Sequence, residues 1–416
     1  MNDDFHQVDA GDTDPVAQTG GEQSHDPDFP EAYLEFMRTG WRESSLSVTR
    51  RPEADRFAAR RAALAAGFEG ETLVIPTGPE RVRANDTTYR FRPGSDFAWL
   101  TGDHDPDSVL IIRPGGEATL YARPRSPRDT DEFFRDRMYG EFWVGRRATL
   151  AEKSAELGVE TAPLADLPAA LGECAPARTR VLRGLDPSVD AQVAPYGEGR
   201  DQELAQTISE LKLVKDDWEL AQLRDAVDAT VRGFEDAVRV LPADRPVSER
   251  LIEGVFGLRA RHDGNDVGYN SIVGAGAHTT ILHWHRNDGL IRPGDLLLAD
   301  MGVENRHLYT ADVTRTIPVN GRFTATQRRI YEIVLAAQQA GIDAVKPGLK
   351  WEDLALTVNR VLAEGLAELG LLPCSVEEAL DKESTVYRRW TLHGFGHMLG
   401  IDVHDCANAR KERYRE

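Results

Sequence analysis

The chain has 416 residues, of which 41% are hydrophobic and 29% charged, a composition typical of a globular protein with more than one hydrophobic core. Its formal net charge of −19 at pH 7 argues against a nucleic-acid-binding protein, which needs a basic face for phosphates, and against docking on anionic lipid. The sequence has no run of about 18 apolar residues, so no membrane-spanning helix is expected.

The cysteines are few and widely spaced, which argues against a disulfide framework and against a zinc–thiolate site. The segment Met1–His6 has neither a basic region nor an apolar run, so no secretory signal is visible. A reducing, cytoplasmic location fits both observations. The cysteines are Cys174, Cys374 and Cys406.

Changes in composition divide the chain into three parts. Residues 1–28 are rich in Asp, Gly, Gln and Thr and are expected to form a disordered acidic tail, because they have little apolar surface to bury. Residues 29–200 alternate short strands with helices, which predicts one mixed α/β domain. A polar break at Glu198–Asp201 precedes a second domain over residues 201–416. The predicted fold class is therefore α/β, or α+β.

Several elements of the first domain can be predicted from local sequence. The Ala-rich run 54–66 predicts a helix, and 72–76 predicts a short buried strand. Two further strands are predicted at 108–112 and 118–122, joined by a Pro-Gly-Gly turn.

The second domain begins with a long predicted helix. Asp216 and Glu219 have the spacing of a capping box, and apolar residues then recur every three or four positions as one helix face. These apolar residues are Leu220, Leu223, Val227, Val231, Phe234 and Val238. Further helices are predicted over 248–261, from Thr326, and from about Trp351 to a C-terminal cap at Gly370.

Two aspartates lie at the ends of two predicted strands between these helices. The apolar run Leu296–Ala299 ends on Asp300, and a Thr-rich extended run carries Asp312. A hairpin turning near Arg306 would place the two aspartates opposite one another, with Cβ atoms about 4.5–5.5 Å apart. Like charges so placed destabilise a sheet unless cations lie between them, and two divalent metals about 3.5–4 Å apart would serve. The alternative from these two residues alone is a pair of solvated strand-end acids.

Histidines gather in two glycine-containing segments. His393 and His397 are four residues apart, but the two glycines between them favour a loop or strand that approaches a ligand closely. One imidazole beside two carboxylates suits manganese, cobalt or zinc. The alternative for any single histidine is a hydrogen-bonded core residue. The second, strand-like segment contains His278, His283 and His285.

Together, these motifs resemble a known family. The two aspartates, with the Val-Thr-Arg-Thr that follows Asp312, and the segment 393–405 are similar to the metallopeptidases with the pita-bread fold, and among them to aminopeptidase P, the Xaa-Pro aminopeptidases. The segments Tyr89–Gly102 and Phe142–Arg147 extend the resemblance to the N-terminal domain, which methionine aminopeptidases generally lack. The resemblance implies an aminopeptidase P-like N-terminal domain followed by a pita-bread catalytic domain.

The family resemblance implies a hydrolase that removes the first residue from peptides with proline in second position. A metal-activated water would attack the Xaa-Pro carbonyl carbon, and the cofactor would be two divalent metal ions, usually Mn²⁺. By resemblance the metal ligands are Asp300, Asp312 and His397.

Resemblance also implies roles for three more histidines. His283 matches a histidine that binds substrate and assists the transition state, and His393 and His404 match two further active-site histidines. Trp143 matches an aromatic residue that reaches a neighbouring subunit in tetrameric relatives. A homo-oligomer, either a dimer or a tetramer, is therefore expected.

The sequence departs from the family in two places. The Asp300-to-Asp312 separation is one residue longer than usual, which a loop can absorb. The family's two glutamates, of which one is a ligand and the usual proton-shuttling base, have no counterpart on an apolar strand, because Glu412 and Glu416 lie in a charged run. The expectation is a C-terminally truncated fragment that lacks its last strands and has an incomplete metal site, which argues for inactivity of this polypeptide.

Three alternative functions remain at the level of sequence. An Xaa-Pro dipeptidase differs only in the length of its substrate. A non-catalytic pita-bread module that binds peptides or proteins would not need this set of aspartates and histidines. A metal-free amidinohydrolase of the same fold is disfavoured by the retention of both aspartates.

Overall fold

The computed structural model describes residues 28–85, 87–197, 199–241 and 244–410. The predicted tail, apart from Asp28, lies outside the described residues, as do Glu412 and Glu416. No helix in the described ranges is long and apolar enough to cross a membrane.

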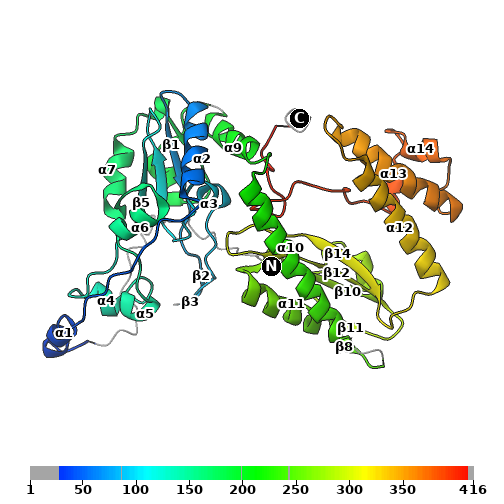
Figure 1. The fold of residues 1–416 in the computed structure, drawn as a ribbon, viewed down its shortest axis with the longest axis horizontal. Coiled ribbons are helices and arrows are strands. Elements are labelled where there is room, and N and C mark those ends of the chain that lie inside the picture. Colours follow the sequence, from blue (N-terminus) through cyan, green and yellow to red (C-terminus); the bar gives the residue numbers. More distant parts are fainter. Residues whose placement is uncertain (1–27, 86, 198, 242–243, 411–416) are drawn as a thin grey trace, which may run out of the picture.

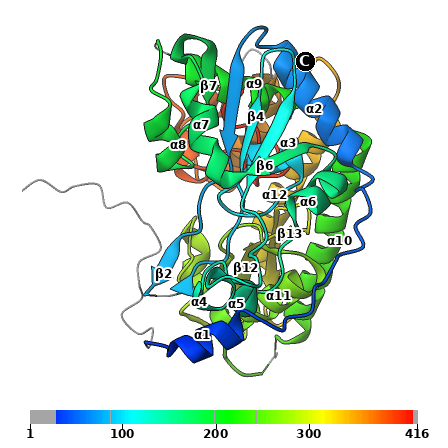
Figure 2. The ribbon, with the colours of Figure 1, turned by 90° about the vertical axis from the view of Figure 1, so that its left-hand side faces the viewer.

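The N-terminal half is built on a five-stranded mixed sheet with helices on both faces (Figures 1 and 2). Side chains alternate along each strand, so Leu73 and Ile75 of the central strand face one side and Val74 faces the other. In order across the sheet the strands are β6 (Glu160–Pro163), β5 (Ala118–Ala122), β4 (Val109–Ile112), β1 (Thr72–Pro76) and β7 (Thr179–Val181).

Four helices pack on the Leu73 face: α2 (Ala54–Ala66), α3 (Ser95–Thr101), α6 (Leu150–Leu157) and α9 (Arg200–Leu211). Two pack on the Val74 face: α7 (Leu167–Gly172) and α8 (Pro187–Gln192). The predicted helix 54–66 and the three predicted strands are confirmed. The remaining α-helices and strands of this half are α1 (Glu31–Met37), β2 (Val82–Ala84), β3 (Thr87–Thr88), α4 (Glu132–Arg135) and α5 (Glu141–Val144).

The C-terminal half is organised around a three-stranded antiparallel sheet, in the order β10 (Ile272–Ala275), β12 (Leu296–Met301) and β14 (Val313–Pro318). Two short pairs flank it: β8 (Val247–Ser248) with β11 (Leu290–Ile291), and β9 (Asp266–Val267) with β13 (Val303–Glu304). Its helices are α10 (Asp217–Arg239), α11 (Glu249–Asp263), α12 (Ala325–Ala344), α13 (Trp351–Glu368) and α14 (Val376–Leu380).

The predicted helix starts and stops of this half are largely confirmed. Asp216 and Glu219 form the capping box of α10. Gly370 follows α13 with φ +67°, the left-handed conformation that glycine adopts at low cost after a helix.

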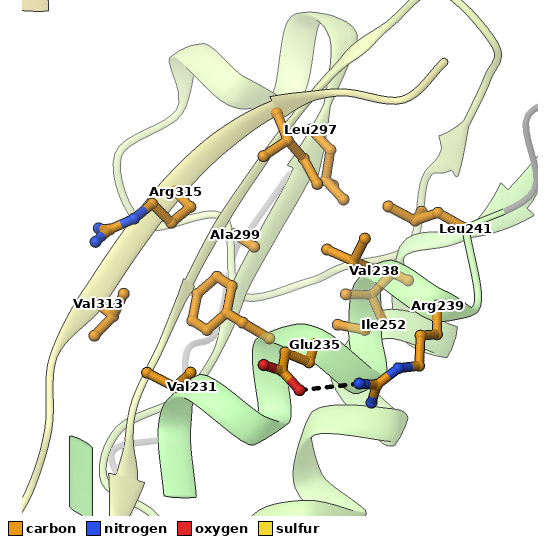
Figure 3. A pocket seen from close by; sticks show the side chains of 13 residues that line it. Val231, Glu235, Val238, Arg239, Leu241, Ile252, Leu297, Ala299, Val313 and Arg315 are labelled. Carbon is orange, nitrogen blue, oxygen red and sulfur yellow. Dashed lines mark hydrogen bonds and ion pairs between the residues drawn. The ribbon is translucent and has the colours of Figure 1, made fainter. Parts of the chain in front are cut away.

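The apolar face predicted for α10 is not its buried face. Val231 and Val238 are each 50% exposed and line an open groove of about 480 Å³ together with Leu297 and Ala299 of β12 (Figure 3). Small residues on another face make the contact with α11, because Gly233 lies so close to Phe256 that no Cβ would fit there. Close approach of the two helices therefore decides which face is buried.

The hairpin register predicted for the two aspartates is wrong. Asp300 lies opposite Thr314, so the register is shifted by two residues from direct opposition with Asp312. The turn comes later than predicted because Asn305 Oδ1 accepts hydrogen bonds from the backbone amides of His307 and Tyr309. A shift of two residues keeps side chains on the same face, so Asp312 is still a diagonal neighbour of Asp300.

Candidate active site

Tyr269 links the two aspartates. Its hydroxyl donates to Asp300 Oδ1 at 2.6 Å and lies 3.0 Å from Asp312 Oδ1. Asp300 is on β12, Asp312 immediately precedes β14, and Tyr269 comes just before β10, so all three strands of the sheet contribute to this contact. The diagonal arrangement therefore brings both carboxylates to one hydroxyl group.

Burial and charge shift the pKa values of these groups. Burial raises the pKa of Asp300, and the charge of Asp312 adds to that shift. Burial and the charge of Asp300 together raise the pKa of Tyr269, so its hydroxyl keeps its proton and remains a donor. Two carboxylates crowded in this way form a place where a cation is favourable.

His397 joins the carboxylates from a distant part of the chain. Its Nε2 lies 3.0 Å from Asp312 Oδ2, and its Nδ1 lies 2.9 Å from the Met398 carbonyl oxygen. This contact lowers the pKa of Asp312 and raises that of His397. The residues around His393 and His397 form a loop, as the intervening glycines predict.

Of the other three predicted histidines, one packs against His397 and two form a separate pair. The His404 ring is 4.4 Å from the His397 ring, measured between centroids. His283 and His393 form a separate pair with centroids 6.3 Å apart. His393 and His397 both line a groove of about 490 Å³ between α12, α13 and the histidine loop.

The predicted ligands meet in pairs rather than as a closed set of three. Within the described residues, no group of three or more His, Cys, Asp or Glu side chains is arranged to hold a metal ion. The donor types nevertheless fit a divalent metal, since two carboxylates and one imidazole are hard to borderline ligands. The proximity of Asp312 to both Tyr269 and His397 is the geometric basis for that fit.

Buried ion pairs hold the loop that carries these histidines. Asp405, whose side chain is 1% exposed, lies 2.7 Å from Lys215 Nζ and 3.4 Å from Lys212 Nζ. Lys212 in turn donates to Asp96 of α3 at 2.7 Å. The segment 390–410 therefore runs from the neighbourhood of α13 to the N-terminal half, where it is fixed (Figure 1).

A second contact joins the halves through Arg92. Its Nε donates to the buried Glu304 of β13 at 2.6 Å, and its Nη2 donates to the Ile401 carbonyl oxygen at 2.8 Å. One N-terminal side chain thus contacts both the strand region that follows Asp300 and the loop that carries His397.

Sequence reasoning assigned no role to Tyr269, Glu249 or Arg92. Arg92 lies within the family-like segment Tyr89–Gly102, but no spacing rule points to Arg92 or to Tyr269. Glu249 follows the N-cap of α11, where an acidic residue is ordinarily explained by the helix dipole alone. Only the fold shows that these side chains meet residues distant in sequence.

Comparisons with known proteins agree with this architecture. Residues 57–182 match the family model for the aminopeptidase P N-terminal domain, and residues 221–416 match metallopeptidase family M24. Xaa-Pro aminopeptidase 1 of Streptomyces coelicolor is 49% identical over 393 residues, which cover 93% of this chain and 79% of that protein.

Two solved structures of the Escherichia coli enzyme are similar to this one. Aminopeptidase P with the inhibitor Pro-Leu has a TM-score of 0.75 at 28% identity, and the match covers 89% of this chain and 84% of that chain. The zinc-substituted enzyme in complex with product has a TM-score of 0.76 at the same identity and coverage.

An aminopeptidase P-like N-terminal domain followed by a pita-bread domain defines a metallopeptidase that uses divalent metal ions. The chain belongs to the aminopeptidase P family, the Xaa-Pro aminopeptidases, and is a metal-dependent aminopeptidase.

Proposed function

We propose that this protein releases the N-terminal residue from peptides whose second residue is proline, with two Mn²⁺ ions as its cofactor. The single observation that supports the site most strongly is the contact of Asp312 with both Tyr269 and His397. The names of the relatives, Xaa-Pro aminopeptidase and aminopeptidase P, support the choice of substrate.

In this proposal Asp300, Asp312 and His397 contribute ligands to the metal ions. The bound metals would activate a water for attack on the Xaa-Pro carbonyl carbon and polarise its oxygen. Tyr269 holds the two carboxylates in a fixed relative orientation, because its hydroxyl contacts both. A fixed orientation matters because small displacements of catalytic groups reduce rates strongly.

The remaining histidines would contact the substrate. His283 is proposed to bind the peptide and assist the transition state, with His393 beside it at 6.3 Å between ring centroids. His404 is proposed as a further active-site group and packs against His397. Five other expectations from the sequence stay predictions. They are a dimeric or tetrameric assembly, a role for Trp143 at a neighbouring subunit, a cytoplasmic location, the absence of nucleic-acid and membrane partners, and the domain boundary near residue 200.

A peptide assay tests this function. The protein, expressed from its complete coding sequence and stripped of metal, is supplied with Mn²⁺ and offered Ala-Pro-Ala, Ala-Ala-Ala and the dipeptide Ala-Pro. We expect Mn²⁺-dependent release of alanine from Ala-Pro-Ala and not from Ala-Ala-Ala. Cleavage of the dipeptide alone would indicate an Xaa-Pro dipeptidase, and binding without cleavage would indicate a non-catalytic module.

A further inference from the structure

Glu249 is a fully buried carboxylate that the proposed reaction does not use. It is the first residue of α11, and its exposed fraction is 0%. Its Oε1 accepts a hydrogen bond from the Ala275 amide at 2.9 Å and lies 2.9 Å from His278 Nδ1. Its Oε2 accepts from Trp284 Nε1 and from the Gly289 amide, both at 2.8 Å.

These four partners all come from one segment of the chain, residues 275–289. Burial alone would raise the pKa of Glu249, but the hydrogen bonds from Trp284, His278 and the two backbone amides outweigh it and lower that pKa. The group is therefore a carboxylate at neutral pH. A buried charge with its hydrogen bonds satisfied in this way holds its partners in one arrangement.

The segment closes tightly around the carboxylate. The His278 ring stacks on the Trp284 ring with a centroid distance of 3.9 Å. A Cβ at Gly289 would lie 2.6 Å from the His278 ring and 2.8 Å from Glu249 Oε1, so only glycine fits there. Asn287 fixes the return of the loop, since its side chain bonds the Val273 amide and the Ser271 carbonyl oxygen.

The middle of the loop, which carries His283, is exposed. Ile281 and Leu282 are 45% and 53% exposed, and His283 and His285 are exposed as well. Trp284, which Glu249 binds directly, lies between the two exposed histidines. The position of His283 next to His393 therefore depends on the two ends of the loop and on Trp284, all of which are bound by the buried carboxylate of Glu249.

We propose that Glu249 is a positioning residue that sets the place of His283 in the active site by binding His278, Trp284 and the two ends of the loop. This inference rests on the proposed role of His283 as the substrate-facing histidine. In this proposal Glu249 does not contact the substrate, and it is not one of the proposed metal ligands Asp300, Asp312 and His397. Its loss should therefore change turnover and leave metal binding unchanged.

The test is a double-mutant cycle in the full-length holoenzyme. Glu249→Gln keeps the side-chain volume but replaces one of the two carboxylate oxygens with an NH₂ group. The partners of that oxygen then lose their acceptor. We expect a fall in kcat of about 10- to 100-fold on Ala-Pro-Ala, with bound Mn²⁺ unchanged. His283→Ala should be slowed too, and the double variant should be no slower than the slower single variant, because both changes remove the same function.

Two further variants guard against a purely structural effect. Trp284→Phe removes one hydrogen bond and keeps an aromatic ring beside His278, so a smaller loss that also disappears in the His283→Ala background is expected. Glu253→Gln, one turn further along the same helix, is the matched control and should leave kcat unchanged. Effects of Glu249→Gln and His283→Ala that multiply, or a loss of bound Mn²⁺ in Glu249→Gln, would overturn the proposal.

A readout without substrate separates this inference from the proposed function. Hydrogen–deuterium exchange over residues 276–289 should be faster in Glu249→Gln than in the parent protein, while exchange in β12 stays unchanged. Inactivity of the parent enzyme on Ala-Pro-Ala would count against the proposed function. Unchanged exchange in the loop would count against the role of Glu249, whatever the parent's activity.

Discussion

Asp312 Oδ2 lies 3.0 Å from His397 Nε2, although 85 residues separate the two in sequence. This contact joins the strand end before β14 to a glycine-containing loop that is itself anchored to the N-terminal half. The proposed metal site therefore depends on the packing of the two halves as well as on local sequence.

Removing the charge of Asp312 tests its proposed role as a ligand. Asp312→Asn should abolish stoichiometric Mn²⁺ binding and lower kcat/KM on Ala-Pro-Ala by at least about 100-fold, since a neutral amide is a much poorer ligand. Metal analysis after gel filtration and a peptide assay measure both effects. The control is Asp55→Asn, which removes a surface ion pair with Arg50 at 2.6 Å in the N-terminal half. Full activity of Asp312→Asn would show that the ligand assignment is wrong.

Tyr269→Phe removes the hydroxyl that contacts both carboxylates. Hydrogen bonds to charged groups contribute about 1.5–3 kcal/mol each, so we expect Mn²⁺ affinity to fall by about tenfold or more. Because the ring is kept, the unfolding midpoint should change little by comparison. Calorimetric titration with Mn²⁺ measures the affinity, and an affinity equal to that of the parent protein would contradict a bridging role for Tyr269.

Metal affinity should rise with pH. The hydrogen bond with Asp312 raises the pKa of His397 above its ordinary value of 6.5. Below that raised pKa the imidazolium proton competes with the metal, and the competition ends as the pH rises through it. Affinity for Mn²⁺ is therefore expected to be weaker at about pH 6 than at about pH 8, with proton release on binding.

The contact between His397 and Asp312 also makes the stability of the metal-free protein depend on pH. One contribution is lost as the pH rises and the other as the pH falls. The raised pKa of His397 stabilises the fold below pH 6.5, and that contribution is lost as the pH rises through the folded value. The lowered pKa of Asp312 stabilises the fold above pH 3.8, and that contribution is lost at lower pH. His397→Ala should flatten both the metal-affinity profile and this stability profile; profiles identical to the parent's would refute the assignment.

Arg92→Met tests the contact between the halves. Glu304 is 3% exposed, and without Arg92 its only remaining side-chain hydrogen-bond partner in the described residues is Asn265 at 2.7 Å. Leaving the buried carboxylate of Glu304 without its cationic partner should lower the free energy of unfolding by about 3 kcal/mol. Urea unfolding measures this, and adding Glu304→Gln should recover part of the loss. A loss within about 0.5 kcal/mol, as for an ordinary surface change, would show that the contact is not stabilising.

Local sequence predicted the elements well where one rule dominates. The helix 54–66, the strand 72–76 and the capping box at Asp216 follow from propensity, apolar runs and side-chain capping, and the structure confirms each. The face of α10 could not be predicted in the same way. Its burial is decided by the close approach of Gly233 to Phe256, which depends on a partner helix.

The candidate site was predictable in its residue types and less so in its geometry. The two aspartates and the histidine loop were found from strand ends and glycine spacing, but the hairpin register was wrong by two residues because the Asn305 side chain moves the turn. Tyr269, Arg92 and Glu249 could not be found, since each acts through a partner that only the tertiary fold brings near.

The most direct measurement is an anomalous difference map from a crystal of the full-length protein with Mn²⁺, recorded where manganese scatters anomalously. We predict peaks within bonding distance of Asp300, Asp312 and His397, with Tyr269 beside the carboxylates. Peaks elsewhere, or no ordered Mn²⁺ at these three side chains in a crystal of active enzyme, would contradict the proposed metal site.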